Sequence, residues 1–318
     1  TPASYISHNE SRRNYDELAN SYIDNGINTD VLFGGGWQYF IREDRNIVNE
    51  YKANNIHYID RYDELTNLPK NKAVMGLFAD EGLPEAIDDT DNYRLSTMTR
   101  AAIPLLENSN GFFMLIEASQ IDWAGHGNDI NSAMAEMTDL ARTIEYLEDY
   151  VDKHPDTLVV LTADHSTGGF TIAANGVYEW RPQLLRAMTQ SANKIAKYFV
   201  ESELSVPALM KELANTEVSQ QEVDDIANIK LIAREKLAAY LALTKIEQKE
   251  KRKPSVQWAI SKAIKKLIDK KTNTGWTSGG HTAVDVPVFA IGAEKQRFAG
   301  SIDNTDIAKQ IFKLLEDK

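Results

Sequence analysis

Two stretches of the sequence decide the expected fold: Gly111–Ile116, which reads GFFMLI, and Thr157–Thr162, which reads TLVVLT. Each is a continuous apolar run of strand length, of the kind that is buried on both faces of a parallel sheet. Between them, apolar residues from Met137 to Val151 recur every three or four positions, which is the pattern of one buried helix face. Strand, helix and strand over about fifty residues predict a right-handed βαβ crossover.

Elements of the same two kinds are predicted on either side of this unit. The helices are expected at 14–24, 45–53 and 306–315, and the strands at 30–33, 57–59, 73–78 and 287–292. Their alternation predicts an α/β fold, a three-layer sandwich with a mostly parallel central sheet. From about 180 to 272 the pattern changes to long helices, and we interpret this part as a helical insertion within one domain that spans 1–318.

Composition excludes several classes of protein. The chain has 318 residues, of which 42% are hydrophobic and 26% charged, as in folded globular proteins. No apolar run approaches the ~18 residues of a membrane span, and the net charge of −12 opposes binding to nucleic acid. The basic cluster at 249–253 is interpreted as a solvated face. Because there is no cysteine, a transition metal would need nitrogen and oxygen ligands.

Candidate metal ligands follow both of the apolar runs that decide the fold. Asp122 and His126 come after the first run, four residues apart, so that one helical turn would place them side by side. Asp164 and His165 come directly after the second run. Carboxyl ends of parallel strands lie along one edge of a sheet, so these side chains, together with Glu117, should converge there. The alternative is a surface hydrogen-bonded pair at 122 and 126, and a turn-capping aspartate at 164.

Two further segments could contribute to such a site. His281 lies in a glycine-rich loop before the strand at 287–292, and glycines let a backbone approach an ion closely. Arg12 carries a guanidinium, which grips two oxygens of a phosphate in a planar fork. On local evidence alone, we interpret Arg12 as an ordinary arginine at the start of a helix rather than as a phosphate clamp.

Four segments together resemble the alkaline phosphatase family. They are Thr1-Pro2-Ala3 with Arg12, then Glu117-x4-Asp122-x3-His126, then Asp164-His165-x-Thr167-Gly168-Gly169, and finally Gly280-His281-Thr282. They occur in the family's order and extend over almost the whole chain.

The resemblance implies a role for each matched residue. A first zinc ion would be held by Asp122, His126 and His281, and a second by Asp164 and His165. A magnesium ion would be bound by Glu117 and Thr1, and the substrate phosphate by Arg12. The implied activity is hydrolysis of phosphomonoesters through a phosphoserine, with Zn²⁺ and Mg²⁺ as cofactors. The resemblance also implies a homodimer and a periplasmic or secreted location.

The sequence departs from the family in one respect. It contains neither the Asp-Gly-Met-Gly segment, whose aspartate bridges metals, nor the Asp-Ser-Ala segment that bears the nucleophilic serine. We therefore interpret the chain as the carboxyl-terminal remainder of an alkaline phosphatase, with an interior strand, one ligand and the nucleophile absent. On this interpretation the chain binds about one zinc ion and turns over phosphomonoesters negligibly.

Two alternatives stay open on the sequence alone. Another enzyme with the same kind of metal site, a phosphodiesterase, phosphomutase or sulfatase, would share the Asp-x3-His, Asp-His and His pattern. A non-catalytic module that binds a metal or phosphate would lack a nucleophile in the same way.

Overall fold

The computed structural model describes residues 7–316, which form two compact units. Within these residues, the first unit comprises 7–120, 136–164 and 286–316, and the second comprises Ile121–Ala135 and His165–Asp285. Thr1, expected to be a magnesium ligand, lies outside the described residues. The insertion expected at about 180–272 lies within the second unit.

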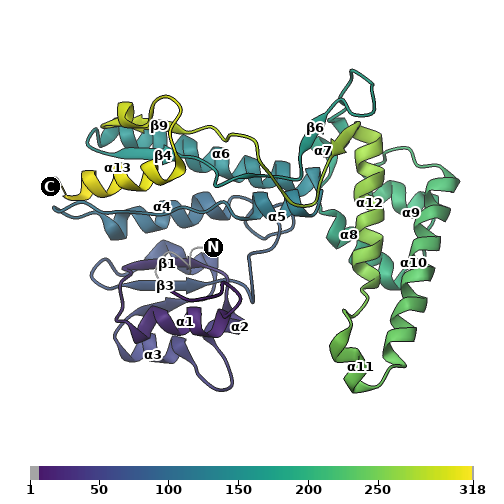
Figure 1. The fold of residues 1–318 in the computed structure, drawn as a ribbon, viewed down its shortest axis with the longest axis horizontal. Coiled ribbons are helices and arrows are strands. Elements are labelled where there is room, and N and C mark those ends of the chain that lie inside the picture. Colours follow the sequence, from purple (N-terminus) through teal and green to yellow (C-terminus); the bar gives the residue numbers. More distant parts are fainter. Residues whose placement is uncertain (1–6, 317–318) are drawn as a thin grey trace. The chain divides into compact units, whose positions relative to one another are not determined.

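The first unit contains a parallel sheet (Figure 1). Its strands are β1 (Val31–Gly34), β2 (His57–Ile59) and β3 (Val74–Leu77), in the order β1-β3-β2. The expected α/β class with a parallel sheet is confirmed, and so are these three strands. All four residues of β3 are buried, as expected for the middle strand of a covered sheet.

Helices cover both faces of this sheet. The helices of the first unit are α1 (Tyr15–Asp24), α2 (Trp37–Phe40), α3 (Ile47–Ala53), α4 (Arg94–Leu106), the larger part of α6 (Ile130–Lys153) and α13 (Asn304–Glu316), with 3₁₀ helices η2 (Tyr62–Asn67) and η3 (Lys295–Phe298). Met75 and Leu77 pack with the buried side chains of α1, α2 and α3, whereas Ile59 on β2 packs with Met98 of α4. Because successive side chains of a strand point to opposite faces of the sheet, the apolar residues of these strands form an apolar layer on each face.

The βαβ crossover is the part of the prediction that was wrong. Helix α6 (Ile130–Lys153) and strand β4 (Leu158–Leu161) form as expected, but β4 pairs antiparallel with β9 (Phe289–Gly292). The run Gly111–Ile116 is extended and belongs to no ladder in the part of the chain that the structure describes. Phe113 is 58% exposed there. An apolar run becomes a strand only when a neighbouring strand bonds to its backbone, and local sequence does not supply that neighbour.

Helices α7 to α12 dominate the second unit, and all of them except α11 contribute buried side chains to one apolar core (Figure 1). They are α7 (Gln183–Ala187), α8 (Ala192–Glu201), α9 (Val206–Glu212), α10 (Gln220–Leu241), α11 (Lys245–Glu250) and α12 (Val256–Thr272). Ile195, Phe199, Ile260 and Ile264 are fully buried between α8 and α12. No helix among residues 7–316 is long and apolar enough to cross a membrane.

Two short antiparallel ribbons complete the second unit. Strands β5 (Ser166–Thr167) and β8 (His281–Thr282) form one of them, and β6 (Phe170–Ile172) and β7 (Thr274–Trp276) form the other. Helix α5 (Gln120–His126) comes shortly before α6. The ribbons and α5 carry the residues of the candidate site.

Candidate metal centre

Helix α5 presents Asp122 and His126 one turn apart, as their spacing predicts. The His126 Nε2 atom lies 3.5 Å from Asp122 Oδ2. The other ring nitrogen, Nδ1, is 2.8 Å from the carbonyl oxygen of Gly279, which can only accept a hydrogen bond. Nδ1 therefore carries the proton, and the lone pair of Nε2 is directed toward Asp122, which is the tautomer that metal ligation needs.

The ribbon of β5 and β8 brings two more histidines together. Thr167 pairs with His281 in this ribbon, and His165 immediately precedes β5. The rings of His165 and His281 stack with centroids 3.5 Å apart and planes inclined by 19°. Because the two strands are 116 residues apart at their Ser166–Thr282 contact, only the folded ribbon makes them neighbours.

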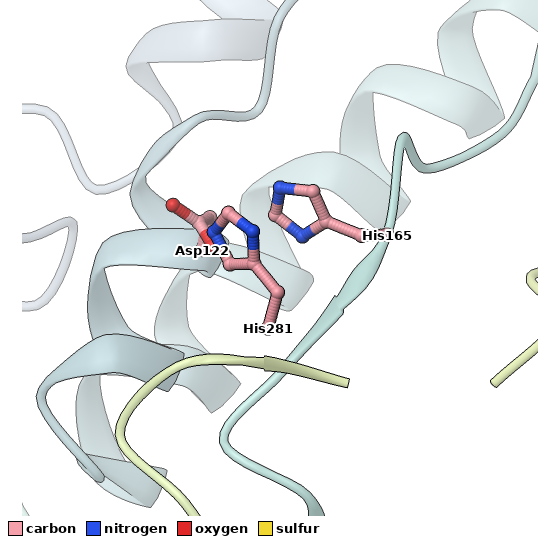
Figure 2. A group of neighbouring side chains, drawn as sticks. All are labelled: Asp122, His165 and His281. Atoms are coloured by element: carbon pink, nitrogen blue, oxygen red, sulfur yellow. The ribbon is translucent and has the colours of Figure 1, made fainter. Parts of the chain in front are cut away.

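Asp122, His165 and His281 form a cluster in which one ligand atom from each residue lies within 4.8 Å of the others (Figure 2). The three side chains point toward one another from α5, from the segment before β5 and from β8. All three belong to the second unit. We call these three residues with His126 the metal cluster.

The geometry of the metal cluster fits a zinc ion. His281 Nε2 lies 3.2 Å from His126 Nε2. Two nitrogens each about 2.05 Å from a tetrahedral zinc are about 3.3 Å apart, so this separation is one that zinc ligation produces. Without a shared proton or a cation, two facing lone pairs would repel each other. Carboxylate and imidazole groups are also the donors that zinc accepts in a chain without cysteine.

Thr167 orients two members of the metal cluster, a role that sequence reasoning did not assign. Its Oγ1 donates a hydrogen bond to Asp122 Oδ1 at 2.5 Å and lies 3.2 Å from His165 Nδ1. Because the hydroxyl proton goes to the carboxylate, His165 Nδ1 donates to Oγ1, which leaves His165 Nε2 as the acceptor. The sequence signal that could have identified Thr167 is its position two residues after His165.

The loop after Thr167 is held by Trp276. A Cβ atom on Gly168 would lie 2.6 Å from Trp276 Cε3, and the residue has a φ of +84°, so only glycine fits beneath the indole. Gly168 donates to the carbonyl of Gly280 at 2.9 Å, and its own carbonyl accepts from Thr277 and Ser278 at 3.1 Å each. These bonds join the backbone next to Thr167 to the backbone next to His281.

The other predicted site residues lie in the first unit. Arg12 is exposed in the turn before α1, Glu117 is half-buried in the extended segment after Ile116, and Asp164 is exposed after β4. The metal cluster belongs wholly to the second unit and contains none of them. Their roles stay predictions, as does the grouping of His165 with Asp164 around a second ion.

Comparison with known proteins gives one consistent result. The family model described as "Alkaline phosphatase" matches residues 1–316. "Alkaline phosphatase 3" of Bacillus subtilis (strain 168) is 41% identical over 328 residues, covering 99% of this chain and 65% of the relative. The chain thus spans about two thirds of the length of that protein.

Solved structures agree with the sequence comparison. The crystal structure of a cold-active alkaline phosphatase from Shewanella sp. superposes with a TM-score of 0.84 at 38% identity, covering 99% of this chain and 72% of that one. A variant of the TAB5 alkaline phosphatase with Mg bound in its M3 site has a TM-score of 0.62 at 25% identity, covering 99% of this chain and 68% of that one.

Proposed function

Because the chain belongs to the alkaline phosphatase family, we propose that the protein is a metal-dependent phosphomonoester hydrolase whose metal site includes Asp122, His126, His165 and His281. One observation carries this proposal, the convergence of Asp122, His165 and His281 within 4.8 Å, with His126 Nε2 at 3.2 Å from His281 Nε2. Zinc fits these nitrogen and oxygen donors better than magnesium, which prefers an octahedron of oxygens.

The residues of the chain divide the chemical work between them. Bound zinc supplies Lewis-acid stabilisation of the attacking and leaving oxygens of a phosphoryl group. His126 is oriented for ligation by the Gly279 carbonyl, and Asp122 by the Thr167 hydroxyl. Arg12 would neutralise the equatorial oxygens of the phosphate as the transition state forms.

The finer assignments rest on family membership. They are a second zinc ion at Asp164 and His165, which would then replace the role of His165 in the metal cluster, a magnesium ion at Glu117 and Thr1, a phosphoserine intermediate, a homodimer and a periplasmic or secreted location. The Asp-Ser-Ala segment that would supply the serine is not among the 318 residues. We therefore expect this polypeptide to bind zinc but to hydrolyse phosphomonoesters negligibly by itself.

Zinc analysis of His281→Ala tests the proposal. The purified polypeptide should bind about one zinc ion, and His281→Ala should lose most of it, because His281 faces two other ligands of the metal cluster. His154→Ala is the control, since this histidine is half-exposed directly after α6, next to Tyr150 and outside the cluster. Equal zinc content in wild type and His281→Ala would reject the site.

Substrate comparison tests the reaction. A protein that joins these residues to the nucleophile segment should hydrolyse a phosphomonoester much faster than a diester. In a diester, one of the phosphate oxygens that Arg12 would bind carries a second ester group. Faster hydrolysis of the diester or of a sulfate ester would favour the alternative enzymes. No turnover of any ester by that longer protein would favour the non-catalytic module.

A further inference from the structure

Helix α12 contacts two of the three segments that lead to histidines of the metal cluster. Lys265 and Asp269 lie one turn apart on this helix, and each bonds to a different segment. Lys265 reaches the turn between α5 and α6, which follows His126, whereas Asp269 reaches Trp276 on the ribbon that leads to His281. No residue of this network belongs to the metal cluster itself.

Lys265 forms a buried ion pair beneath the end of α5. Its Nζ lies 3.2 Å from Asp129 Oδ2, and the two side chains are 13% and 3% exposed. Asp129 also accepts a hydrogen bond from the backbone of Ser132 at 3.0 Å, which caps the start of α6. A Cβ atom on Gly127 would lie 3.1 Å from Lys265 Nζ, so the ammonium lies against the backbone next to His126.

Asp269 holds the indole that covers Gly168. Trp276 Nε1 donates to Asp269 Oδ1 at 3.2 Å, and the same indole lies against Gly168. Gly168 follows Thr167, whose hydroxyl binds Asp122. A continuous set of contacts therefore runs from α12 through Trp276 to the carboxylate of the metal cluster.

A side-chain amide joins the two segments that α12 holds. With its nitrogen facing two carbonyls, Asn128 donates to Gly125 on α5 at 3.0 Å and to Ser278 at 2.9 Å. His126 Nδ1 bonds to Gly279 in the same loop. The end of α5 and the loop before His281 therefore form one connected body on α12.

We propose that Lys265 and Asp269 are positioning residues that set the separation of the zinc ligands, Lys265 through the turn after His126 and Asp269 through Trp276. This inference rests on the proposed function, because it concerns the zinc site. The physical reason is that zinc needs its ligands within a few tenths of an ångström of a tetrahedron, and ligands on separate segments are aligned only if those segments share a rigid base.

The charge on Asp269 makes this role dependent on pH. Burial, together with the nearby charge of Asp129, raises the pKa of Asp269 to about 7, although the Trp276 hydrogen bond and Lys265 act to lower it. Asp129 and Lys265 are the charged groups that act on it. As the pH rises through 7, the carboxylate forms and its bond to the indole becomes charge-assisted and stronger. The hydrogen bond from Trp276 to Asp269 is therefore stronger at neutral to alkaline pH than at acidic pH.

Zinc affinity measured by competition with a chelator tests the proposal without any assay of turnover. We compare wild type, Asp269→Asn, Trp276→Phe and the double variant at pH 6 and pH 8. At pH 8 each single variant should bind zinc about 5-fold more weakly, and the double variant about as weakly as Trp276→Phe alone. At pH 6 the Asp269→Asn variant should differ little from wild type, because the wild-type carboxyl is then protonated.

The control is Asp224→Asn, which removes an exposed carboxylate from α10 in the same unit. It should leave the zinc affinity unchanged at both pH values. The inference is overturned if Asp269→Asn matches wild type at pH 8, if its loss is the same at both pH values, or if the two losses multiply in the double variant. Zinc binding by wild type with unchanged binding by the variants would leave the proposed function standing. Absence of zinc binding by wild type would reject both.

Discussion

Single side chains around the metal cluster do two kinds of work, ligation and orientation. His126 shows both, since Nε2 faces the cluster while Nδ1 is bonded to Gly279. Thr167 only orients, through one hydroxyl that contacts both Asp122 and His165. Residues that bind ligands rather than metals determine which atom of each ligand is available.

Thr167→Val should lower zinc affinity with little effect on folding. Valine has nearly the same shape but no hydroxyl, so Asp122 and His165 lose the hydrogen bonds that orient them. We expect zinc to bind about 10-fold more weakly in a chelator competition. Thr167→Ser, which restores the hydroxyl, should recover most of the affinity. Equal affinity of Thr167→Val and wild type would show that Thr167 does not orient the ligands.

Asp269 predicts the pH dependence of folding stability. Its pKa is raised to about 7 by burial, whereas an unfolded aspartate titrates near its ordinary value of 3.8. Between about pH 4 and pH 7 the unfolded chain therefore loses a proton that the folded chain keeps, so the free energy of unfolding falls as the pH rises. Above pH 7 both states are ionised and the loss is constant.

Asp269→Asn should remove this slope. Urea unfolding of the metal-free protein should show that the variant gains on the order of 1–3 kcal/mol relative to wild type between pH 4 and pH 8. The same variant is expected to bind zinc more weakly at pH 8, so stability and affinity should change in opposite directions. An identical pH slope in both proteins would contradict the raised pKa.

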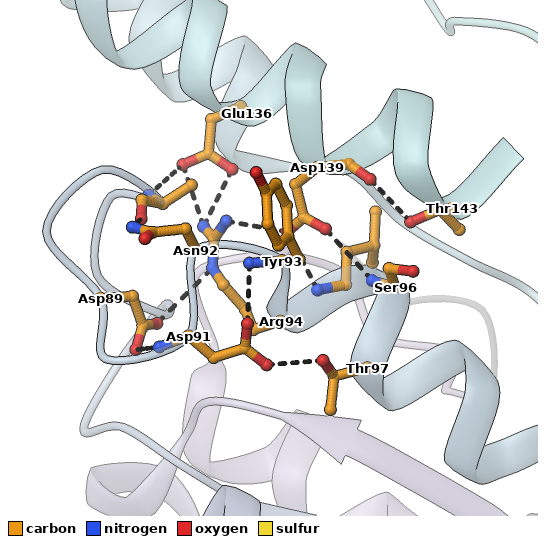
Figure 3. A network of polar contacts seen from close by, with 12 residues as sticks. Asp89, Asp91, Asn92, Tyr93, Arg94, Ser96, Thr97, Glu136, Asp139 and Thr143 are labelled. Carbon is orange, nitrogen blue, oxygen red and sulfur yellow. Dashed lines mark hydrogen bonds and ion pairs between the residues drawn. The ribbon is translucent and has the colours of Figure 1, made fainter. Parts of the chain in front are cut away.

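Elements are joined to one another by buried polar groups as well as by apolar packing. Arg94 at the start of α4 lies among three carboxylates, two of them on α6 and the third in the loop before α4 (Figure 3). Its guanidinium is 2.8 Å from Glu136 Oε2 and 3.0 Å from Asp139 Oδ2, and all these side chains are less than a tenth exposed. Asp139 also accepts hydrogen bonds from the backbone of Leu95 and Ser96, which caps α4.

Arg94→Met should destabilise the first unit strongly. Removing the one cation leaves buried carboxylates without their partner, which costs about 3–5 kcal/mol in comparable buried pairs. Burial already raises the pKa of Glu136 and Asp139, so the loss should be larger at pH 8 than at an acidic pH, where protonation removes the charges. The measurement is urea unfolding at both pH values.

The control for this variant lies on the same helix. Arg100 is exposed, and its guanidinium lies 4.2 Å from the ring centroid of Tyr146. Arg100→Met should cost less than about 1 kcal/mol at either pH. Equal losses in the two variants would show that the buried carboxylates are not what Arg94 neutralises.

The molecule as a whole combines well-buried cores with an exposed apolar surface in the first unit. Phe113 in the extended run, Phe289 on β9 and Phe312 on α13 are each about 60% exposed, at 58%, 58% and 63%. Exposed aromatic rings such as these can bind other apolar groups.

Phe113→Ser tests that surface. Because the side chain is mostly in water, its removal should change the free energy of unfolding by less than about 1 kcal/mol and lower the fluorescence of the apolar dye ANS. Phe199→Ser is the contrast, since this ring is fully buried between α8 and α12 and its loss should cost about 3–5 kcal/mol. A large loss of stability in Phe113→Ser would mean that the ring is buried in solution.

Local sequence determined helices α1, α3, α6 and α13, the helical character of about 180–272, strands β1 to β4 and β9, the α/β class and the residue types of a nitrogen and oxygen metal site, but not helices α2 and α4. Hydrophobic periodicity and the spacing of Asp122 and His126 depend on neighbours within a few positions, so both can be recognised in the sequence alone. Only the tertiary structure decided that β4 pairs antiparallel with β9, that Gly111–Ile116 joins no ladder, and that His165 stacks on His281. The same holds for Thr167, Lys265 and Asp269, whose partners are distant in the chain. Strand pairing and side-chain contact depend on which remote residue lies opposite, and a pattern of local residue types does not contain that information.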